Sequence, residues 1–329
     1  MSINLHHLRL FAAVVDQGGF TKAAAALNLS QPAISKSLNE LERQLHVKLL
    51  DRGGRSPRLT EAGKLLHARA RELFGVERIA ERELRELRGL KRGILRVAAS
   101  TTIATYMLPP VLGRFRVRHR GVSIRISSAN TRTVLRMLLE SRVDVALVEG
   151  PVSHARVEVK PWIQDELVVI APPDHALVHR RARVEELAEY PFLVRELGSG
   201  TRVVSQRALA RHGIRLTNTM RVGSTEAIKQ SVAAGLGLAI VSRAAAADQI
   251  ALGKIAVVHV DDFVIHRTLT QLKLRDRAPS GVARELEFLL DDEAVGRGEG
   301  DGSADASGDA GAGGGGAEGR GRDRFVERQ

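Results

Sequence analysis

The sequence contains no cysteine, and it has no run of about 18 apolar residues of the kind a membrane-spanning helix requires. Without cysteine there is no disulfide framework, no thiolate metal site and no cysteine nucleophile. The N-terminus MSINLHHLRLF lacks the basic region and long apolar run of a secretory signal. We therefore expect a cytoplasmic protein with no membrane partner.

The 329 residues include 50 Lys and Arg against 38 Asp and Glu, which gives a formal net charge of +12. A positive excess of this size favours a polyanion or an anionic surface as partner. The length suffices for two or three domains. Composition thus favours a multidomain protein with an anionic partner but does not identify that partner.

Residues 20–45, FTKAAAALNLSQPAISKSLNELERQL, contain two helical patterns separated by a short break. Apolar residues recur at helical spacing in both, and Ser30 followed by Pro32 predicts that the second helix begins near Gln31. Residues 5–15 predict one further amphipathic helix. Together these patterns predict a three-helix core around a helix-turn-helix, with the motif itself at about 20–39.

The second helix of this motif has a polar face opposite its apolar stripe. Amide, hydroxyl and cationic side chains suit the acceptors of the DNA major groove, although an ordinary solvated helix face is the alternative. Residues 48–60, KLLDRGGRSPRLT, predict a two-stranded wing whose arginines either contact phosphates or form a solvated basic loop. The candidate DNA contacts are Thr21, Gln31, Pro32, Ser35, Lys36, Asn39, Arg43, Arg52 and Arg55.

Residues 1–65 resemble the winged helix-turn-helix of LysR-type transcriptional regulators. The resemblance rests on Ala23-Ala24, on LSQPAIS from Leu29 to Ser35, on Arg52 and on LTEAG from Leu59 to Gly63. It implies that Gln31, Pro32 and Ser35 lie at the DNA and that Arg52 is the wing arginine. Leu50 stands where the family usually has phenylalanine, which affects the packing of the wing.

A helical pattern continues from Thr60 to about Leu90, with a ladder of apolar residues at a and d positions among Arg and Glu, namely Leu66, Ala70, Leu73, Ala80, Leu84 and Leu87. It predicts a seam between two copies of the chain, while a long helix packed on its own domain is the alternative. The resemblance also implies a dimerisation helix here. The expected seam residues are Leu66, Leu73, Ala80, Leu84 and Leu87.

After Gly93, short strands alternate with helical stretches to about Leu290, which predicts parallel strands in two small sheets. Strands are expected at 94–99, 124–127, 143–148, 167–171, 192–194, 220–222, 238–241 and 268–274. The runs LLESRVDVALVEGP, GSGTR and VAAGLGLAIVS resemble the effector-binding domain of the same regulators. This implies the fold of periplasmic solute-binding proteins, with two subdomains and a cleft between them.

The predicted fold class is therefore α+β and multidomain. An all-α winged helix-turn-helix occupies 1–60, a linker helix 61–92 and an α/β periplasmic-binding-protein-like domain 93–290. Its subdomains are 93–164 with 268–290, and 165–267. Residues 291–329 are rich in Gly, Asp and Ala and are expected to be a disordered tail.

Hydroxyl-bearing segments follow the first strand of this domain and open a later helix. Such segments bind carboxylate, sulfate or phosphate well, although they can also be simple helix caps. The resemblance implies that Ser100, Thr102 and Thr201 line the inducer site, while Ile103 replaces a polar residue found in some relatives. The full candidate set is Ser100, Thr101, Thr102, Asn130, Thr131, Glu149, Ser199, Gly200 and Thr201.

No Ser, His and Asp set indicates nucleophilic catalysis, so we expect neither an enzyme nor a cofactor. His175 and His179 lie four residues apart, but Pro172-Pro173 favours a loop, and no metal site is expected. The expected function is a LysR-type regulator that binds a dyad-symmetric promoter operator as a dimer or tetramer. It would respond to a small anionic co-inducer and, as an activator, contact RNA polymerase. The rival is a small-molecule-binding protein without a DNA target, which leaves residues 20–45 unexplained.

Overall fold

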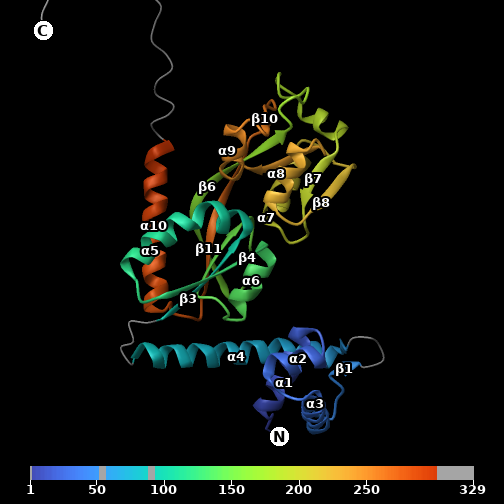
Figure 1. Cartoon of the computed structure of the whole chain (residues 1–329), viewed down its shortest axis with the longest axis vertical. Coiled ribbons are helices and arrows are strands. Elements are labelled where there is room, and N and C mark those ends of the chain that lie inside the picture. Colours follow the sequence, from blue (N-terminus) through green and yellow to red (C-terminus); the bar gives the residue numbers. More distant parts are fainter. Residues whose placement is uncertain (1, 52–56, 88–92, 302–329) are drawn as a thin grey trace, which may run out of the picture.

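The computed structural model describes residues 2–51, 57–87 and 93–301, and Figure 1 shows the path of the chain. Helices α1 (Leu5–Gln17), α2 (Phe20–Leu27) and α3 (Gln31–Leu45) share one core, as predicted. Asn4 caps α1, and Gly18 ends it with a φ of +74°, which glycine adopts without strain. Strands β1 (Leu50–Asp51) and β2 (Arg58–Leu59) pair antiparallel and form the predicted wing.

Helix α4 (Glu61–Leu87) joins these helices to the rest of the molecule and runs along the lower edge of the α/β region (Figure 1). At Gly75 the two pack tightly, since an added Cβ would lie 3.1 Å from the carbonyl oxygen of Glu140. Arg78 donates to the same carbonyl at 2.6 Å, and Arg71 forms an ion pair with the Glu140 carboxylate. Helix α4 is therefore fixed to both parts of the chain.

The strands of the α/β region form one nine-stranded sheet in the described part of the chain, ordered β4-β3-β5-β11-β6-β9-β7-β8, with β10 paired to β6. The pairs β3–β4, β3–β5, β7–β8 and β7–β9 are parallel, and all pairs that involve β6 or β11 are antiparallel. The bounds are β3 (Ile94–Ser100), β4 (Ser123–Ala129), β5 (Val145–Glu149), β6 (Val157–Ala171), β7 (Phe192–Arg195), β8 (Thr219–Val222), β9 (Leu238–Ser242), β10 (Ala256–Val258) and β11 (Ile265–Leu274).

The prediction of two separate parallel sheets is wrong, because β6 and β11 connect the two halves by direct hydrogen bonds. Sequence reasoning missed β10 and the first part of β6, which is polar and contains Pro161. Proline cannot donate to a strand ladder, and the register between β6 and β11 shifts opposite this point, between Leu269 and Thr270. In Figure 1, β6 and β11 lie between a lower half with β3 and β4 and an upper half with β7 and β8.

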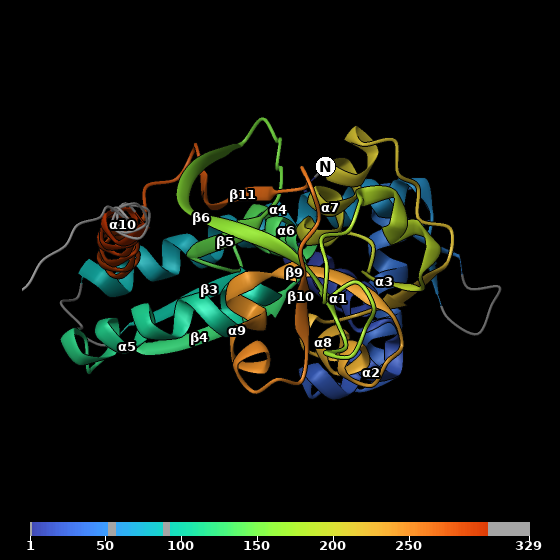
Figure 2. The same ribbon diagram turned by 90° about the horizontal axis from the view of Figure 1, so that it is seen from above.

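Helices cover both halves of the sheet, and α5 and α10 lie side by side at one end in both views (Figure 2). The bounds are α5 (Leu108–Arg118), α6 (Thr131–Leu139), α7 (Gly200–Arg211), α8 (Thr225–Ala233), α9 (Arg243–Ala251) and α10 (Gly281–Asp301). A π-helical turn, η1 (Ile103–Met107), and a 3₁₀ helix, η2 (Val184–Glu189), complete the set of described helices.

The predicted disordered tail begins too early, because α10 extends to Asp301. Its residues past position 290 are held by ion pairs. The Nζ of Lys160 lies 2.6 Å from the Asp291 carboxylate, and Arg114 contacts Asp292 at 3.0 Å and Glu293 at 2.6 Å. The rest of the expected tail, 302–329, lies outside the described residues. Among the helices that are described, none is long and apolar enough to cross a membrane.

Candidate DNA-reading surface and ligand site

The polar face of α3 is open to solvent. Ser30 accepts a hydrogen bond from the Ala33 amide at 3.3 Å and caps the helix, whose opposite side is buried in the three-helix core. The structure brings six of the expected DNA contacts onto this one face. Gln31, Pro32, Lys36, Asn39 and Arg43 are exposed and Ser35 is half-buried, and all but Gln31 line one hollow together with His7.

An acidic residue that sequence reasoning missed lies on the same face. The carboxylate of Glu40 accepts from Nε of Arg43 at 2.9 Å and from its Nη2 at 2.6 Å. This hydrogen bond holds the pKa of Glu40 below its ordinary range and raises the pKa of Arg43. Part of the charge of Arg43 is therefore neutralised within the helix. The sequence did contain a signal for this pair, because Glu40 and Arg43 lie three residues apart on a predicted helix and are therefore neighbours on its surface.

The remaining expected DNA contacts are Thr21, Arg52 and Arg55. Thr21 is exposed in the first turn of α2. Arg58, a further arginine of the wing that was not among the expected contacts, is exposed on β2. Arg52 and Arg55 lie outside the described residues.

The buried carboxylate of Glu42 holds the start of the wing against α3. It accepts from the amides of Leu49 at 2.8 Å and Leu50 at 3.2 Å, and Nζ of Lys48 lies 3.2 Å away. Burial tends to raise the pKa of Glu42, but these donors lower it below its ordinary range. The buried carboxylate of Glu42 thus positions the wing. The sequence pattern predicted only that Glu42 lies on a helix, and not this role.

Helix α4 carries two apolar stripes instead of the single predicted ladder. Leu66 packs against the three-helix core, and Ala70, which belongs to the same predicted ladder, is fully buried in it, so the assignment of Leu66 to the dimer seam is corrected. The outer stripe comprises Leu73, Val76, Ala80 and Leu84, with Leu73, Val76 and Leu84 being 40%, 65% and 61% exposed. The side chain of Leu87 is outside the described part of the structure.

Glu149 lies at the centre of the candidate ligand site. Its carboxylate accepts from Thr102 Oγ1 at 3.2 Å and from Thr201 Oγ1 at 3.1 Å, and all three residues are buried. Thr102 follows β3, Glu149 ends β5 and Thr201 is in the first turn of α7, so the two halves of the α/β region meet here. The two threonines were expected as free donors to a ligand, and the structure shows them engaged by Glu149 instead.

The other hydroxyls of the candidate set take different roles. Asn130 and Ser199 cap α6 and α7 by accepting from the amides of Thr133 and Arg202, which is the alternative that the sequence left open. Thr131 donates to the Glu149 carbonyl at 2.8 Å. Ser100 alone of the set has a buried hydroxyl with no hydrogen-bond partner among the described residues.

Gly200 permits the close contact between α7 and β5. A Cβ built at this position would lie only 1.5 Å from the carbonyl oxygen of Glu149, so no larger residue fits without moving the helix. Glycine at this point therefore serves packing between the halves rather than ligand binding alone.

Two buried arginines complete the site, and sequence reasoning missed both. Arg267 on β11 contacts the carboxylate of Glu149, donates to Thr201 Oγ1 at 2.8 Å and places Nε 2.7 Å from Asp165. Arg195 on β7 donates to Thr101 Oγ1 at 3.4 Å, to Thr225 and to Glu196. Each arginine therefore bridges segments from both halves.

A further bridge lies beside η1. The Tyr106 hydroxyl donates to Glu226 of α8 at 2.8 Å, and Nζ of Lys229 lies 2.9 Å from the same carboxylate. The hydrogen bond from Lys229 holds the pKa of Glu226 below its ordinary range. Lys229 also lies over the Tyr106 ring, 4.8 Å from its centroid. Direct contacts therefore join the two halves along the whole candidate site.

Comparison with known proteins adds independent findings. Residues 5–64 match a family model described as a bacterial regulatory helix-turn-helix protein of the lysR family, and residues 88–294 match one described as a LysR substrate binding domain. The chain is 36% identical to the uncharacterized HTH-type transcriptional regulator YeiE of Escherichia coli K12 over 297 residues, which are 90% of this chain and 100% of YeiE.

Solved structures are similar as well. The CcmR regulatory domain of Synechocystis PCC6803, in complex with 2-PG, is 27% identical with a TM-score of 0.57, over 62% of this chain and 98% of that one. Full-length CbnR complexed with its target DNA superposes with a TM-score of 0.62 at 21% identity, over 89% of this chain and 99% of CbnR. The similarity to CbnR concerns the fold alone.

Proposed function

Because the chain belongs to the LysR family of transcriptional regulators, we propose that it reads its operator with α3 and senses a small anion where β3, β5 and α7 meet. The family membership makes it a DNA-binding regulator with an effector-binding domain, in a family whose members form oligomers. The rival, a ligand-binding protein without a DNA target, leaves the match of residues 5–64 unexplained.

The orphan hydroxyl of Ser100 carries the anion proposal. A buried hydroxyl without a partner costs about 1–3 kcal/mol, which a ligand acceptor would recover. Ser100 ends β3, beside β5 with its terminal Glu149, and Thr101 next to it already receives a bond from the buried guanidinium of Arg195. A carboxylate or phosphate at Ser100 would lie close to this positive charge. In this proposal Thr102 and Thr201 act indirectly. Their hydroxyls bind the Glu149 carboxylate, and they either release it when the anion binds or hold its negative charge away from the anion.

Isothermal titration of the full chain with 2-PG, the ligand of the CcmR regulatory domain, tests this site. Ser100→Ala should weaken binding by about 10- to 100-fold, as expected for a hydrogen bond to a charged group. Ser128→Ala on the adjacent strand β4, which is exposed, is the matched control and should bind as the wild type does. Equal affinity of wild type and Ser100→Ala for 2-PG would show that the anion does not bind at Ser100.

We propose that the outer stripe of α4 forms the seam between two copies. Leu73, Val76, Ala80 and Leu84 are separated by three, four and four residues, which places them side by side along one face of the helix. Two α3 helices tethered in this way would read two half-sites of an operator with dyad symmetry. Footprinting on DNA next to the gene should then show paired protected segments. If the regulator is an activator, transcription by RNA polymerase on that DNA should rise with the effector.

A further inference from the structure

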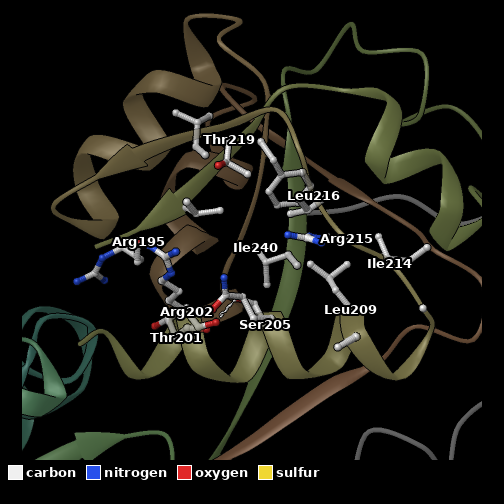
Figure 3. Close-up of a pocket in the computed structure, with 16 residues that line it drawn as sticks. Arg195, Thr201, Arg202, Ser205, Leu209, Ile214, Arg215, Leu216, Thr219 and Ile240 are labelled. Carbon is white, nitrogen blue, oxygen red and sulfur yellow. Dashed lines mark hydrogen bonds between the residues drawn. The ribbon is translucent and has the colours of Figure 1, made fainter. Parts of the chain in front are cut away.

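A cavity of about 490 Å³ lies between α7 and the sheet, within the upper half of the α/β region. Figure 3 shows the residues that line it. One face of α7 forms its floor through Arg202, Ser205 and Leu209. Strands β7, β8 and β9 and the loop at 213–216 form the other walls. The volume lies in the range of small-molecule sites, whereas protein interiors otherwise contain few voids larger than a water molecule.

This cavity adjoins the site around Ser100 and Glu149, because Thr201 and Arg195 contribute to both, but neither Ser100 nor Glu149 lines it. The opposite face of α7, with Val204, Arg207 and Arg211, borders a different groove beside β11. The hydroxyl of Thr201, at the end of the cavity, is already engaged by Glu149 and Arg267. A ligand held within the cavity therefore contacts the sheet-facing side of α7 and does not bridge the two halves.

The walls of the cavity are partly apolar and partly basic. The apolar lining residues include Phe192, Leu209, Ile214, Leu216 and Ile240. Figure 3 shows Arg195 and Arg202 at one end of the cavity, and Arg215 beside Leu216 and Ile214 at the other. The other lining residues include the arginines at positions 195, 202 and 215, and none of the described lining residues is acidic. Such walls suit a molecule with an apolar body and one negative group.

The hydrogen bonds of Arg202 indicate where the negative group binds. Its Nη1 donates to the Arg195 carbonyl at 3.0 Å, which fixes the guanidinium at the wall. Its Nε is buried and has no hydrogen-bond partner among the described residues. Arg195, in contrast, is already paired with Glu196. An incoming carboxylate would accept a hydrogen bond from the unpaired Nε of Arg202.

We propose that this cavity is a second ligand site, which binds a small amphipathic carboxylate with its charged group on Arg202 and its apolar chain toward Leu209 and Ile240. Arg202 directly follows Thr201, so the bound molecule contacts the helical turn that joins the two halves. The proposal does not depend on the anion site at Ser100.

Titration calorimetry of the full chain with octanoate, and with 1-octanol as the uncharged analogue, tests the proposal. The wild type should bind one octanoate per chain at least tenfold more tightly than octanol. Arg202→Met should remove this preference and leave octanol binding unchanged. Ser205→Leu should weaken both ligands at least tenfold by filling the cavity, since the Ser205 hydroxyl bonds only to carbonyls of its own helix.

Arg207→Met, on the opposite face of α7, is the matched charge control, and Ser100→Ala separates this site from the other one. Both should bind octanoate as the wild type does. Absence of octanoate binding by the wild type, or unchanged binding by Arg202→Met and Ser205→Leu, overturns the proposal. Equal losses in Arg202→Met and Arg207→Met also overturn it, because they would indicate unspecific attraction by surface charge. Circular dichroism confirms that each variant is folded.

Discussion

Replacing Arg267 by methionine should destabilise the α/β region far more than the loss of an exposed arginine would. The side chain of Arg267 is 2% exposed and serves two carboxylates, those of Glu149 and Asp165, whose side chains are 2% and 3% exposed. Methionine retains an apolar side chain of similar length but leaves both charges without their cation. Asp165 keeps one donor, the Ser242 hydroxyl at 2.7 Å.

The magnitude follows from burial. Removal of one partner of a buried ion pair typically costs about 3–5 kcal/mol, and since two carboxylates lose their partner here we expect the upper half of this range. The matched control is Arg243→Met. Arg243 pairs with Glu166 at 2.5 Å, but the two side chains are 49% and 34% exposed, so its loss should cost about 0–1 kcal/mol.

Urea unfolding followed by tryptophan fluorescence measures the difference. The sequence has a single tryptophan, Trp162, which lies on β6 in the core of the α/β region and donates to the Leu290 carbonyl at 2.8 Å. Arg267→Met should lower the unfolding midpoint by about 1 M or more. Asp165→Asn added to Arg267→Met should recover part of the loss, because it removes one uncompensated charge.

Two results would refute this reasoning. The first is an equal loss of stability in Arg267→Met and Arg243→Met, which would mean that burial does not set the cost. The second is a double variant, Arg267→Met with Asp165→Asn, that is no more stable than Arg267→Met alone. The loss would then reflect packing rather than unpaired charge.

Three further predictions concern the N-terminal part. Glu42→Gln should lower the free energy of unfolding by about 1–3 kcal/mol at neutral pH. Because the pKa of Glu42 is lowered in the folded chain, thermal melts should show the difference between wild type and variant shrinking as the pH falls through that pKa. Gln31→Ala should weaken operator binding in gel shifts by about 1–3 kcal/mol and should weaken binding to random DNA much less. An equal loss for both DNAs would show that Gln31 does not contact the bases. Leu73→Glu with Leu84→Glu should reduce the mass seen by light scattering and operator affinity together, and an unchanged mass would remove α4 from the interface.

Local signals in the sequence were enough to predict the three N-terminal helices. Ser30 and Pro32 define the start of α3 within the first turn, and the spacing of Ile34, Leu38 and Leu41 defines its buried side. These features involve neighbours in the chain, so no tertiary contact is needed to interpret them. The exposed face of α3 follows from the same periodicity.

Periodicity could not show which partner an apolar stripe contacts. On α4 the predicted ladder mixed residues of two faces, and only packing reveals that Ala70 belongs to the core while Leu73 is exposed. Composition likewise predicted disorder after position 290, yet ion pairs with Lys160 and Arg114 hold the continuing helix α10. In both cases the deciding contact comes from residues distant in sequence.

The sequence by itself determined the family, the helix-turn-helix and the polar segments near the ligand site. Only the tertiary structure decided what those polar groups do: it brings Glu149 between Thr102 and Thr201 and places Arg267 against both Glu149 and Asp165. These partners lie 47 to 118 positions apart, and β6 and β11 bring them together by crossing between the halves. A buried charge is stable only with a matched partner, and that match depends on three-dimensional position rather than on spacing along the chain.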